Sequence, residues 1–283
     1  MRRKRSIRRN IGDYRRSGDW SGYWSTRISS ATDGKILVRG YPAEEIIEYC
    51  SFIEATWLII KGELPSTREA KMFEAVLMSG LDQQFISSEV CAGRYVASAA
   101  PENPVAAVAA GMLATGTVTG SPADAAAMIY HAYKLSEQER LDSTATAVRI
   151  VDSYLAEGKR IPGIGHPIHT RFDPRAEALR KVVTRIGGWG PKASLFDAIH
   201  AEFVQRKGSF LPQNLAGVAA CVYVELGFTL VEILALNGLG YSVAMVAHVI
   251  EEIEEGVPLR IIPEALGAKY VGRPERHIVK RKI

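Results

Sequence analysis

The residues with the clearest chemical potential lie in one short stretch, Arg160 to His169, and in Asp173-Pro174-Arg175 just after it. Glycines and prolines recur through the stretch, and because neither continues a helix well, they predict a rigid turn. Glycine also lets backbone N–H groups approach a ligand closely, since no Cβ intervenes. The imidazoles of His166 and His169 and the guanidinium of Arg175 follow the turn. We interpret the stretch as a loop that holds an anion beside a proton-transfer group. The alternative is a buried turn with a satisfied histidine.

The motif Pro162-Gly163-Ile164-Gly165-His166, followed by Asp173-Pro174-Arg175, resembles the coenzyme A (CoA) loop of the citrate synthase superfamily. The variant His166-Pro167-Ile168-His169 is closer to the short citryl-CoA lyase branch of that superfamily, which includes the C-terminal part of ATP-citrate lyase. The similarity extends over residues 24–272. It implies an all-α, citrate-synthase-like fold with a large helical lobe and a small helical lobe.

The resemblance also implies a domain order. Residues 1–23 would form a basic and aromatic N-terminal arm, and residues 24–159 and 211–283 would form the large lobe. Residues 160–210 would form the small lobe, which carries the CoA loop. In that family the backbone of the loop reads the adenine of CoA, its histidine binds the keto acid and its arginine binds a carboxylate. The CoA-binding residues implied here are Arg160, Pro162, Gly163, Ile164 and Gly165.

The reaction of the family forms or cleaves a carbon–carbon bond next to a thioester, and it needs a base and an oxyanion donor. Four positions that match the motifs of the family carry other residues in this chain. Ala216 stands where the aspartate base belongs, and Thr119 where a histidine stabilises the enol. Gln83 replaces the first substrate histidine, and Tyr241 replaces an arginine before the final helix. Citrate synthase and citryl-CoA lyase activity are therefore not expected.

A rebuilt site would use the side chains that remain. The expected catalytic residues are His166, Thr119 and Tyr241. The expected substrate-binding residues are Gln83, His169, Arg175 and Asn214.

Three function classes stay open. The first is an enzyme that acts on another acyl-CoA or acyl thioester, a lyase or transferase whose substrate carries fewer carboxylates than citrate. The second is an inactive subunit that pairs with an active paralogue. The third, a protein that binds nucleic acid or a membrane surface through its basic arm, is not supported by the near-neutral remainder of the chain.

The composition sets broad limits. A chain of 283 residues with 47% hydrophobic residues suffices for a large core or two lobes. No apolar run is long enough to span a membrane. Cys50, Cys91 and Cys221 are far apart in apolar helical settings, which predicts reduced core thiols in a cytoplasmic protein. The histidines show no metal-ligand spacing, so no metal is expected. The family resemblance implies CoA as the ligand.

The net charge of +4 is concentrated at the N-terminus, where basic residues dominate residues 1–16 and Asp13 is the single acid. Such a run is most often a solvated tail. Contact with an acidic partner or a transit peptide are the alternatives.

Apolar periodicity and capping residues predict helices along most of the chain. Their expected ranges are 42–62, 66–78, 88–100, 104–115, 122–135, 137–157, 174–186, 191–207, 214–226 and 242–255, with a strand pair or extended link at 35–41. The acids that end the last helix should fray it or find basic partners. Segments 88–116 and 215–226 are rich in small residues, which predicts burial against a two-fold mate in a homodimer or larger oligomer. If the loop backbone holds adenine, Gly163→Val should abolish CoA binding and leave the melting temperature nearly unchanged.

Overall fold

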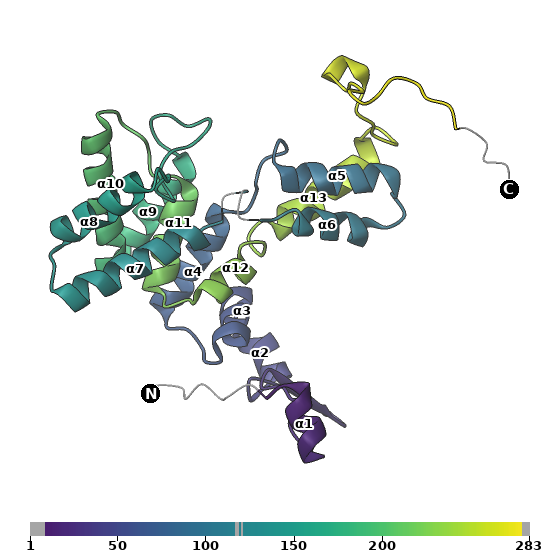
Figure 1. Cartoon of the computed structure of the whole chain (residues 1–283). Coiled ribbons are helices and arrows are strands. Elements are labelled where there is room, and N and C mark those ends of the chain that lie inside the picture. Colours follow the sequence, from purple (N-terminus) through teal and green to yellow (C-terminus); the bar gives the residue numbers. More distant parts are fainter. Residues whose placement is uncertain (1–8, 117–118, 120, 279–283) are drawn as a thin grey trace. The chain divides into compact units, whose positions relative to one another are not determined.

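The computed structural model describes residues 9–116, Thr119 and residues 121–278. It is predominantly helical with one small sheet, so the predicted all-α class is confirmed (Figure 1). The chain divides into two compact units, Met1–Glu74 and Ala75–Ile283, and the boundary falls inside helix α4 (Thr67–Ser79). The first part of the basic N-terminal run, residues 1–8, lies outside the described residues.

The first unit contains the strands. β1 (Ser29–Thr32), β2 (Lys35–Val38) and β3 (Tyr41–Pro42) form an antiparallel sheet in that order. The strand signal around residues 35–41 is thus confirmed. Arg39 follows β2, and its Nε donates to the Ile59 carbonyl at 2.8 Å, which ties the sheet to the helix that carries Ile59.

The helices of this unit are α1 (Ile11–Ser17), α2 (Ala43–Tyr49), α3 (Phe52–Lys61) and the first part of α4. The single helix expected over 42–62 is wrong, because the chain breaks between α2 and α3. Ser51 starts α3 with a capping box in which its hydroxyl accepts from the Glu54 N–H, and the Glu54 carboxylate accepts from the Ser51 N–H. The expected box between Ser66 and Glu69 is present at the start of α4.

Two sets of helices make up the second unit. One set is α5 (Ser88–Ala99), α6 (Pro104–Leu113) and α13 (Ser242–Glu255), which pack on one another. The other set is α7 (Ala123–Glu139), α8 (Ser143–Ala156), α9 (Pro174–Arg185), α10 (Pro191–Lys207), α11 (Leu215–Glu225) and α12 (Leu230–Leu236). A short 3-10 turn, Glu264–Leu266, follows α13.

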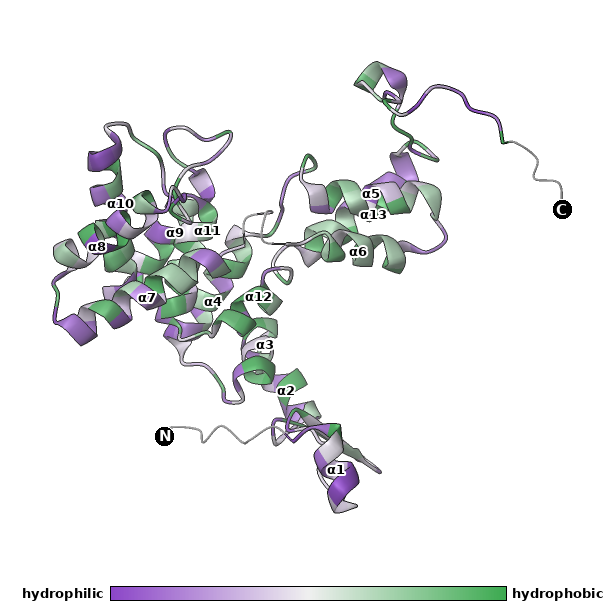
Figure 2. Cartoon of the chain, in the orientation of Figure 1, coloured by the Kyte–Doolittle hydropathy of each residue, from purple (hydrophilic) through white to green (hydrophobic). Residues whose placement is uncertain are grey.

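Helix α11 is the centre of the larger set and packs against α7, α9 and α10. Every side chain from Gly217 to Val224 is buried, and the helix is hydrophobic around its circumference (Figure 2). Such a helix belongs in a core. The expectation that 215–226 buries against a two-fold mate is therefore wrong, because α11 is already covered within its own chain.

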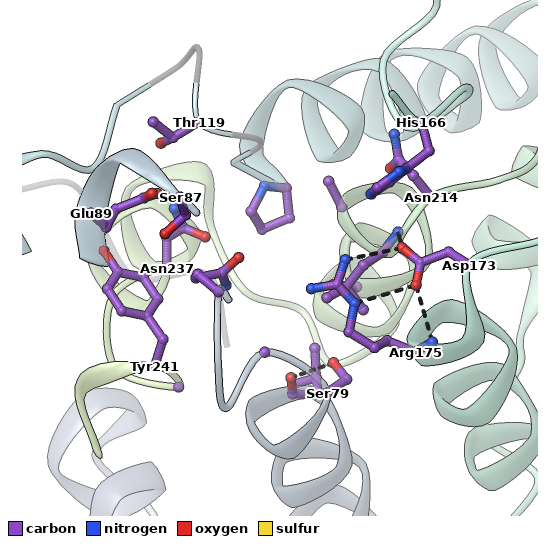
Figure 3. Close-up of a pocket in the computed structure, with 18 of the residues that line it drawn as sticks. Ser79, Ser87, Glu89, Thr119, His166, Asp173, Arg175, Asn214, Asn237 and Tyr241 are labelled. Carbon is purple, nitrogen blue, oxygen red and sulfur yellow. Dashed lines mark hydrogen bonds and ion pairs between the residues drawn. The ribbon is translucent and has the colours of Figure 1, made fainter. Parts of the chain in front are cut away.

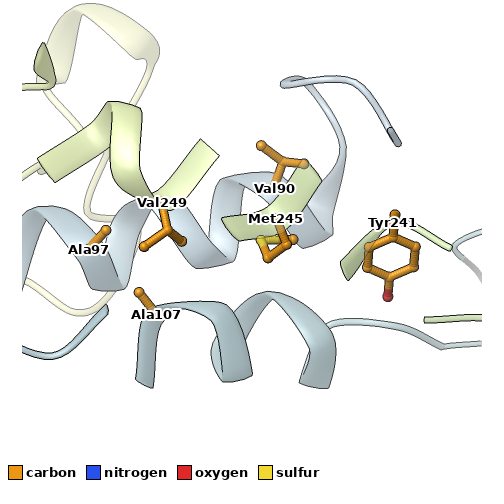
Figure 4. Packing of buried hydrophobic residues seen from close by; sticks show 6 residues of the cluster. All are labelled: Val90, Ala97, Ala107, Tyr241, Met245 and Val249. Atoms are coloured by element: carbon orange, nitrogen blue, oxygen red, sulfur yellow. The ribbon is translucent and has the colours of Figure 1, made fainter. Parts of the chain in front are cut away.

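The smaller set has a separate core, made of Val90, Ala97, Ala107, Tyr241, Met245 and Val249 (Figure 4). Small residues bring these helices together. A Cβ added at Gly93 would lie 2.7 Å from the Met245 sulfur, so α5 and α13 approach as closely as they do only because position 93 has no side chain.

The acidic end of α13 finds basic partners, as expected. Glu252 is fully buried and accepts from Arg94 Nε at 2.7 Å and from the Arg260 guanidinium. Burial alone would raise the pKa of Glu252, but the two arginines outweigh burial and lower it. These ion pairs fasten the segment after α13 to α5.

The cysteines are all unpaired, and only Cys221 is a core thiol. Burial raises the pKa of Cys221 well above its ordinary value, which makes it unreactive. The expectation of a core position is wrong for Cys91, which is exposed. In the described ranges, no helix combines the length and the apolar character needed to cross a bilayer.

Candidate functional site

A cavity of about 450 Å³ lies within the second unit and collects many of the predicted site residues. His166, Arg175, Asn214, Gln83, Thr119 and Tyr241 all line it, as does Gly165. Figure 3 shows His166, Asn214, Asp173 and Arg175 on one side of the cavity and Thr119, Glu89 and Tyr241 on the other. The sequence motifs therefore converge on one place, although they are spread over some 160 residues of chain.

The glycine loop is fixed to the start of α11. The Gly165 N–H donates to the Pro212 carbonyl at 2.7 Å, and the Asn214 N–H donates to the Gly163 carbonyl at 2.9 Å. Asn214 completes the clamp with its side chain, since Nδ2 donates to the Gly165 carbonyl at 2.7 Å and Oδ1 accepts from the Gly217 N–H. Both ends of the Asn214 amide thus hold the backbone in place beside the cavity.

The two loop glycines have positive φ angles, +85° and +90°, but different surroundings. A Cβ at Gly163 would lie 2.6 Å from the Gly217 Cα and 3.0 Å from the Phe196 ring, whereas a Cβ at Gly165 would meet nothing within 4 Å. Gly163 therefore allows the loop to pack on α11, and Gly165 is the glycine with open space in front of it. The expectation that Gly163→Val leaves the melting temperature unchanged is wrong, because the new side chain would collide with backbone.

His166 is held in one protonation form by its own loop. The backbone N–H groups of Ile168 and His169 both donate to His166 Nδ1, at 3.1 and 3.0 Å. Nδ1 must then be an unprotonated acceptor, so the neutral ring carries its proton on Nε2. Burial lowers the pKa of His166, an effect that the nearby His169 and Arg175 reinforce and Asp173 opposes. His166 is accordingly a neutral hydrogen-bond donor near pH 7.

Asp173 organises the arginine of the site. It caps α9 by accepting from the Arg175 N–H at 3.0 Å, and its carboxylate also accepts from Arg175 Nε and Nη2, each at 3.3 Å. The same carboxylate accepts from the Leu215 N–H of α11 at 3.1 Å. Burial favours a higher pKa for Asp173, but the Arg175 guanidinium and these N–H groups produce a net decrease. Asp173 holds Arg175 at the cavity wall, and among the described residues nothing accepts from Nη1, which leaves that nitrogen for a ligand carboxylate.

Ala216 lies on the cavity wall at the start of α11. A methyl group cannot accept a proton, so Ala216 supplies no base to the cavity. Thr119, another predicted replacement, forms hydrogen bonds within its own loop. The Thr119 hydroxyl bonds the Gly116 backbone, and its neighbours Thr117, Val118 and Gly120 lie outside the described residues.

Tyr241 is 2% exposed, and its hydroxyl forms a hydrogen bond with the Thr115 hydroxyl. Burial, and secondarily the charge of Glu89, raises the pKa of Tyr241 to about 12. The phenol therefore stays protonated at neutral pH and serves as a hydrogen-bonding group rather than as an acid.

Five predicted site residues lie outside the cavity lining: Arg160, Pro162, Gly163, Ile164 and His169. The His169 ring lies against the His166 ring, with centroids 4.4 Å apart and planes tilted by 36°, so His169 is next to the site through that contact. Arg160 is exposed, and Pro162 and Ile164 are half-buried parts of the loop. Sequence reasoning gave no role to Glu89, which lines the cavity and is 4% exposed. Its spacing from Gly93 and Ala97 places it on the buried face of α5, and that spacing was a usable signal.

The comparisons with known proteins agree with this fold. A family model described as "Citrate synthase, C-terminal domain" matches residues 22–92 and 90–262. A solved structure of citryl-CoA lyase from Hydrogenobacter thermophilus is 31% identical, with a TM-score of 0.80, and the match covers 90% of this chain and 97% of that one. The chain belongs to the citrate synthase family.

Two other relatives are longer proteins. ATP citrate lyase from Methanothrix soehngenii, solved in complex with citrate and coenzyme A, is 20% identical with a TM-score of 0.74, over 95% of this chain and 45% of that one. A citrate synthase from Dictyostelium discoideum is 31% identical over 65 residues, a stretch that spans 20% of this chain and 13% of that protein. The chain thus corresponds to less than half of the lengths of these two relatives.

Proposed function

We propose that this protein binds CoA or an acyl-CoA at the loop of residues 160–165 and a carboxylate-bearing substrate in the adjoining cavity. The observation that carries the proposal is the open backbone of Gly165, which lies at the cavity rim and is held by Asn214. A flat adenine ring or a thioester chain needs backbone that no Cβ covers. The CoA bound to the Methanothrix soehngenii enzyme supports the ligand class.

Arg175 and His166 are the proposed carboxylate-binding groups. Arg175 supplies a cation whose direction is fixed by Asp173, and His166 supplies a neutral N–H from Nε2. In this arrangement the site orients an anion without itself changing protonation state near neutral pH.

We further propose that the reaction is not citrate synthesis or citryl-CoA cleavage but chemistry on another acyl thioester. Ala216 supports this, since the cavity has no carboxylate there to remove an α-proton. The chain alternatively serves as an inactive subunit beside an active paralogue, in which case CoA binds and no substrate turns over.

Calorimetric titration of CoA tests the binding proposal. The wild-type protein should bind CoA, and Gly165→Ala should weaken binding at least about tenfold, since a methyl group would occupy the ligand-facing backbone. Gly158→Ala is the matched control, because Gly158 has a φ of +62° and open space but lies before the loop. Equal affinity in all three proteins would remove the loop from the proposal.

We also propose self-association. Val105 and Leu113 on α6 and Val243, Val246 and Ile250 on α13 are exposed, an amount of apolar surface that a second copy would cover. Sedimentation at micromolar concentration should give a dimer or larger species, and Leu113→Asp should shift it toward monomer. A monomeric wild-type protein that assembles only with an intact paralogue would instead favour the inactive-subunit alternative.

A further inference from the structure

Glu89 is a cavity-lining carboxylate that the proposed binding of CoA and of a carboxylate leaves unused. It sits in the first turn of α5, after the N-cap Ser87, and is 4% exposed. A glutamate in the first turn is favoured by the helix dipole, but such residues ordinarily extend into water. Burying a carboxylate costs free energy unless a partner compensates. Its position at the wall of a cavity suggests that a ligand is that partner.

The surroundings of Glu89 are polar but provide no cation. In Figure 3, Glu89 lies next to Tyr241 and Ser87, on the side of the cavity opposite Arg175. After burial, the negative charge of Glu89 is the second cause of the raised pKa of the Tyr241 phenol. The phenol in turn bonds the Thr115 hydroxyl. The described lining of this side contains no lysine or arginine.

The two sides of the cavity therefore differ in sign. Arg175 is the arginine of the described lining, and the other acid, Asp173, is already bonded to it and to Leu215 N–H. Glu89 lines the opposite side of the cavity, where no arginine or lysine of the described lining pairs with it. A ligand with one carboxylate can bind at Arg175, but a second carboxylate at its far end would meet Glu89, and like charges in a desolvated site repel each other.

We propose that Glu89 determines the specificity of this cavity: it accepts a hydrogen bond from a hydroxyl or ammonium group of a substrate whose carboxylate is held by Arg175, and it excludes dicarboxylates. The inference rests on the proposed carboxylate site. It narrows the substrate class to ω-hydroxy or ω-amino monoacids, or to acyl groups that end in such a donor. Citrate, with carboxylates along its whole length, falls outside that class.

Matched ligands of equal length test the inference by calorimetric titration. One set is succinate, γ-hydroxybutyrate and γ-aminobutyrate, and the other is glutarate, δ-hydroxyvalerate and δ-aminovalerate. In at least one set the wild-type protein should bind the hydroxy or amino acid at least about tenfold more tightly than the diacid. A preference for the diacid in either set, or no binding of any of the six, would overturn the proposal.

Variants then assign the preference to the carboxylate. Glu89→Gln should reduce the preference at least about fivefold by removing the repulsion, whereas Glu89→Asp should retain it because the charge remains. Glu102→Gln is the control, because Glu102 is exposed in the α5–α6 connection and the substitution removes the same charge away from the cavity. An unchanged preference in folded Glu89→Gln, checked by circular dichroism, or an equal loss in Glu102→Gln, would contradict the inference.

CoA titration keeps this test separate from the proposed function. If CoA binds but the ligand sets show no preference, the assignment of Glu89 fails alone. If the preference is present and CoA does not bind, the CoA proposal fails and the cavity specificity stands.

Discussion

The two glycines of the loop should respond differently to the same substitution, and the difference is set by what a Cβ would meet. In Gly163→Ala the new methyl group would lie 2.6 Å from the Gly217 Cα, and φ is +85°. Adopting a left-handed backbone costs a non-glycine residue about 1–2 kcal/mol. Forcing an additional methyl group into a packed contact costs about 1–3 kcal/mol more, because the backbone of α11 cannot rotate away as a side chain could.

Gly165→Ala isolates the first of these costs. Its φ of +90° carries the same backbone strain, but its Cβ would point into open space. For a domain of this size, 1 kcal/mol shifts the melting temperature by roughly 2–4 °C. Gly163→Ala should therefore melt about 2–12 °C below Gly165→Ala, measured by thermal unfolding followed by far-UV circular dichroism.

The result that would refute this reasoning is an equal decrease in both variants. It would mean that the loop moves away from α11 at no cost, and that the clamp formed by Asn214 does not fix the loop. Gly158→Ala, with φ of +62° and open space, measures the strain term a second time outside the loop.

Further predictions concern Asp173, His166 and Ala216 around the cavity. Asp173→Ala should lower the free energy of unfolding by about 2–4 kcal/mol, because it removes a helix cap and leaves Arg175 without its carboxylate partner. A denaturant titration measures this change. An unchanged free energy of unfolding would contradict the role of Asp173. Because folding lowers the pKa of Asp173, its carboxylate stabilises the folded protein above the unfolded pKa of about 3.9, and this stabilisation is lost as the pH falls through the lower folded pKa. The Asp173→Ala variant should lack this part of the decrease in stability at acid pH. Folding also lowers the pKa of His166, so the neutral ring stabilises the folded protein above the unfolded pKa of about 6.5, and this stabilisation is lost as the pH falls toward the folded pKa. Nitrogen NMR at pH 7 should therefore show a neutral ring with its proton on Nε2. A protonated Nδ1 would be inconsistent with the two backbone N–H groups that donate to it. Ala216→Asp alone should not give citrate synthase or citryl-CoA lyase activity, because Thr119 and Gln83 still lack imidazoles and the effects of groups that act as a unit are not additive. Full activity in that variant would show that the aspartate was the single group that the site lacked.

Most of the fold was predictable from local signals. Pro174 and Pro191 begin α9 and α10, and Asn214 caps α11, as their sequence positions indicate. The errors arose where a local signal competed with a longer pattern. Apolar periodicity continues from 42 to 62, but the capping box at Ser51 ends one helix and begins another.

The predicted site was less complete, for a physical reason. The loop motif and its family resemblance predicted His166 and Arg175 as site residues, and both line the cavity. Glu89 carries no motif, and its importance arises from burial at a cavity wall that helices distant in sequence create. Likewise, only the packing of Gly163 on Gly217 distinguishes it from Gly165, and no sequence pattern encodes that contact.

The same limit applies to the small-residue segments. The sequence of α11 suggests a surface made for another subunit, but its small residues instead admit the loop at Gly217 and the neighbouring helices. Small side chains indicate a close approach, and the partner in that approach depends on topology.

If this protein binds CoA thioesters without the acid/base groups for citrate chemistry, it should show almost no citrate synthase or citryl-CoA lyase activity. The most direct measurement is the release of free thiol from acetyl-CoA with oxaloacetate by the unmodified protein, together with the reverse cleavage of citryl-CoA. The rate should be at least about 10⁴-fold below that of an ordinary enzyme, since a base and an oxyanion donor each contribute about 10² or more. Turnover near about 1 per second, within the ordinary range for enzymes, would contradict it and would show that another group does the work assigned to the missing aspartate at position 216.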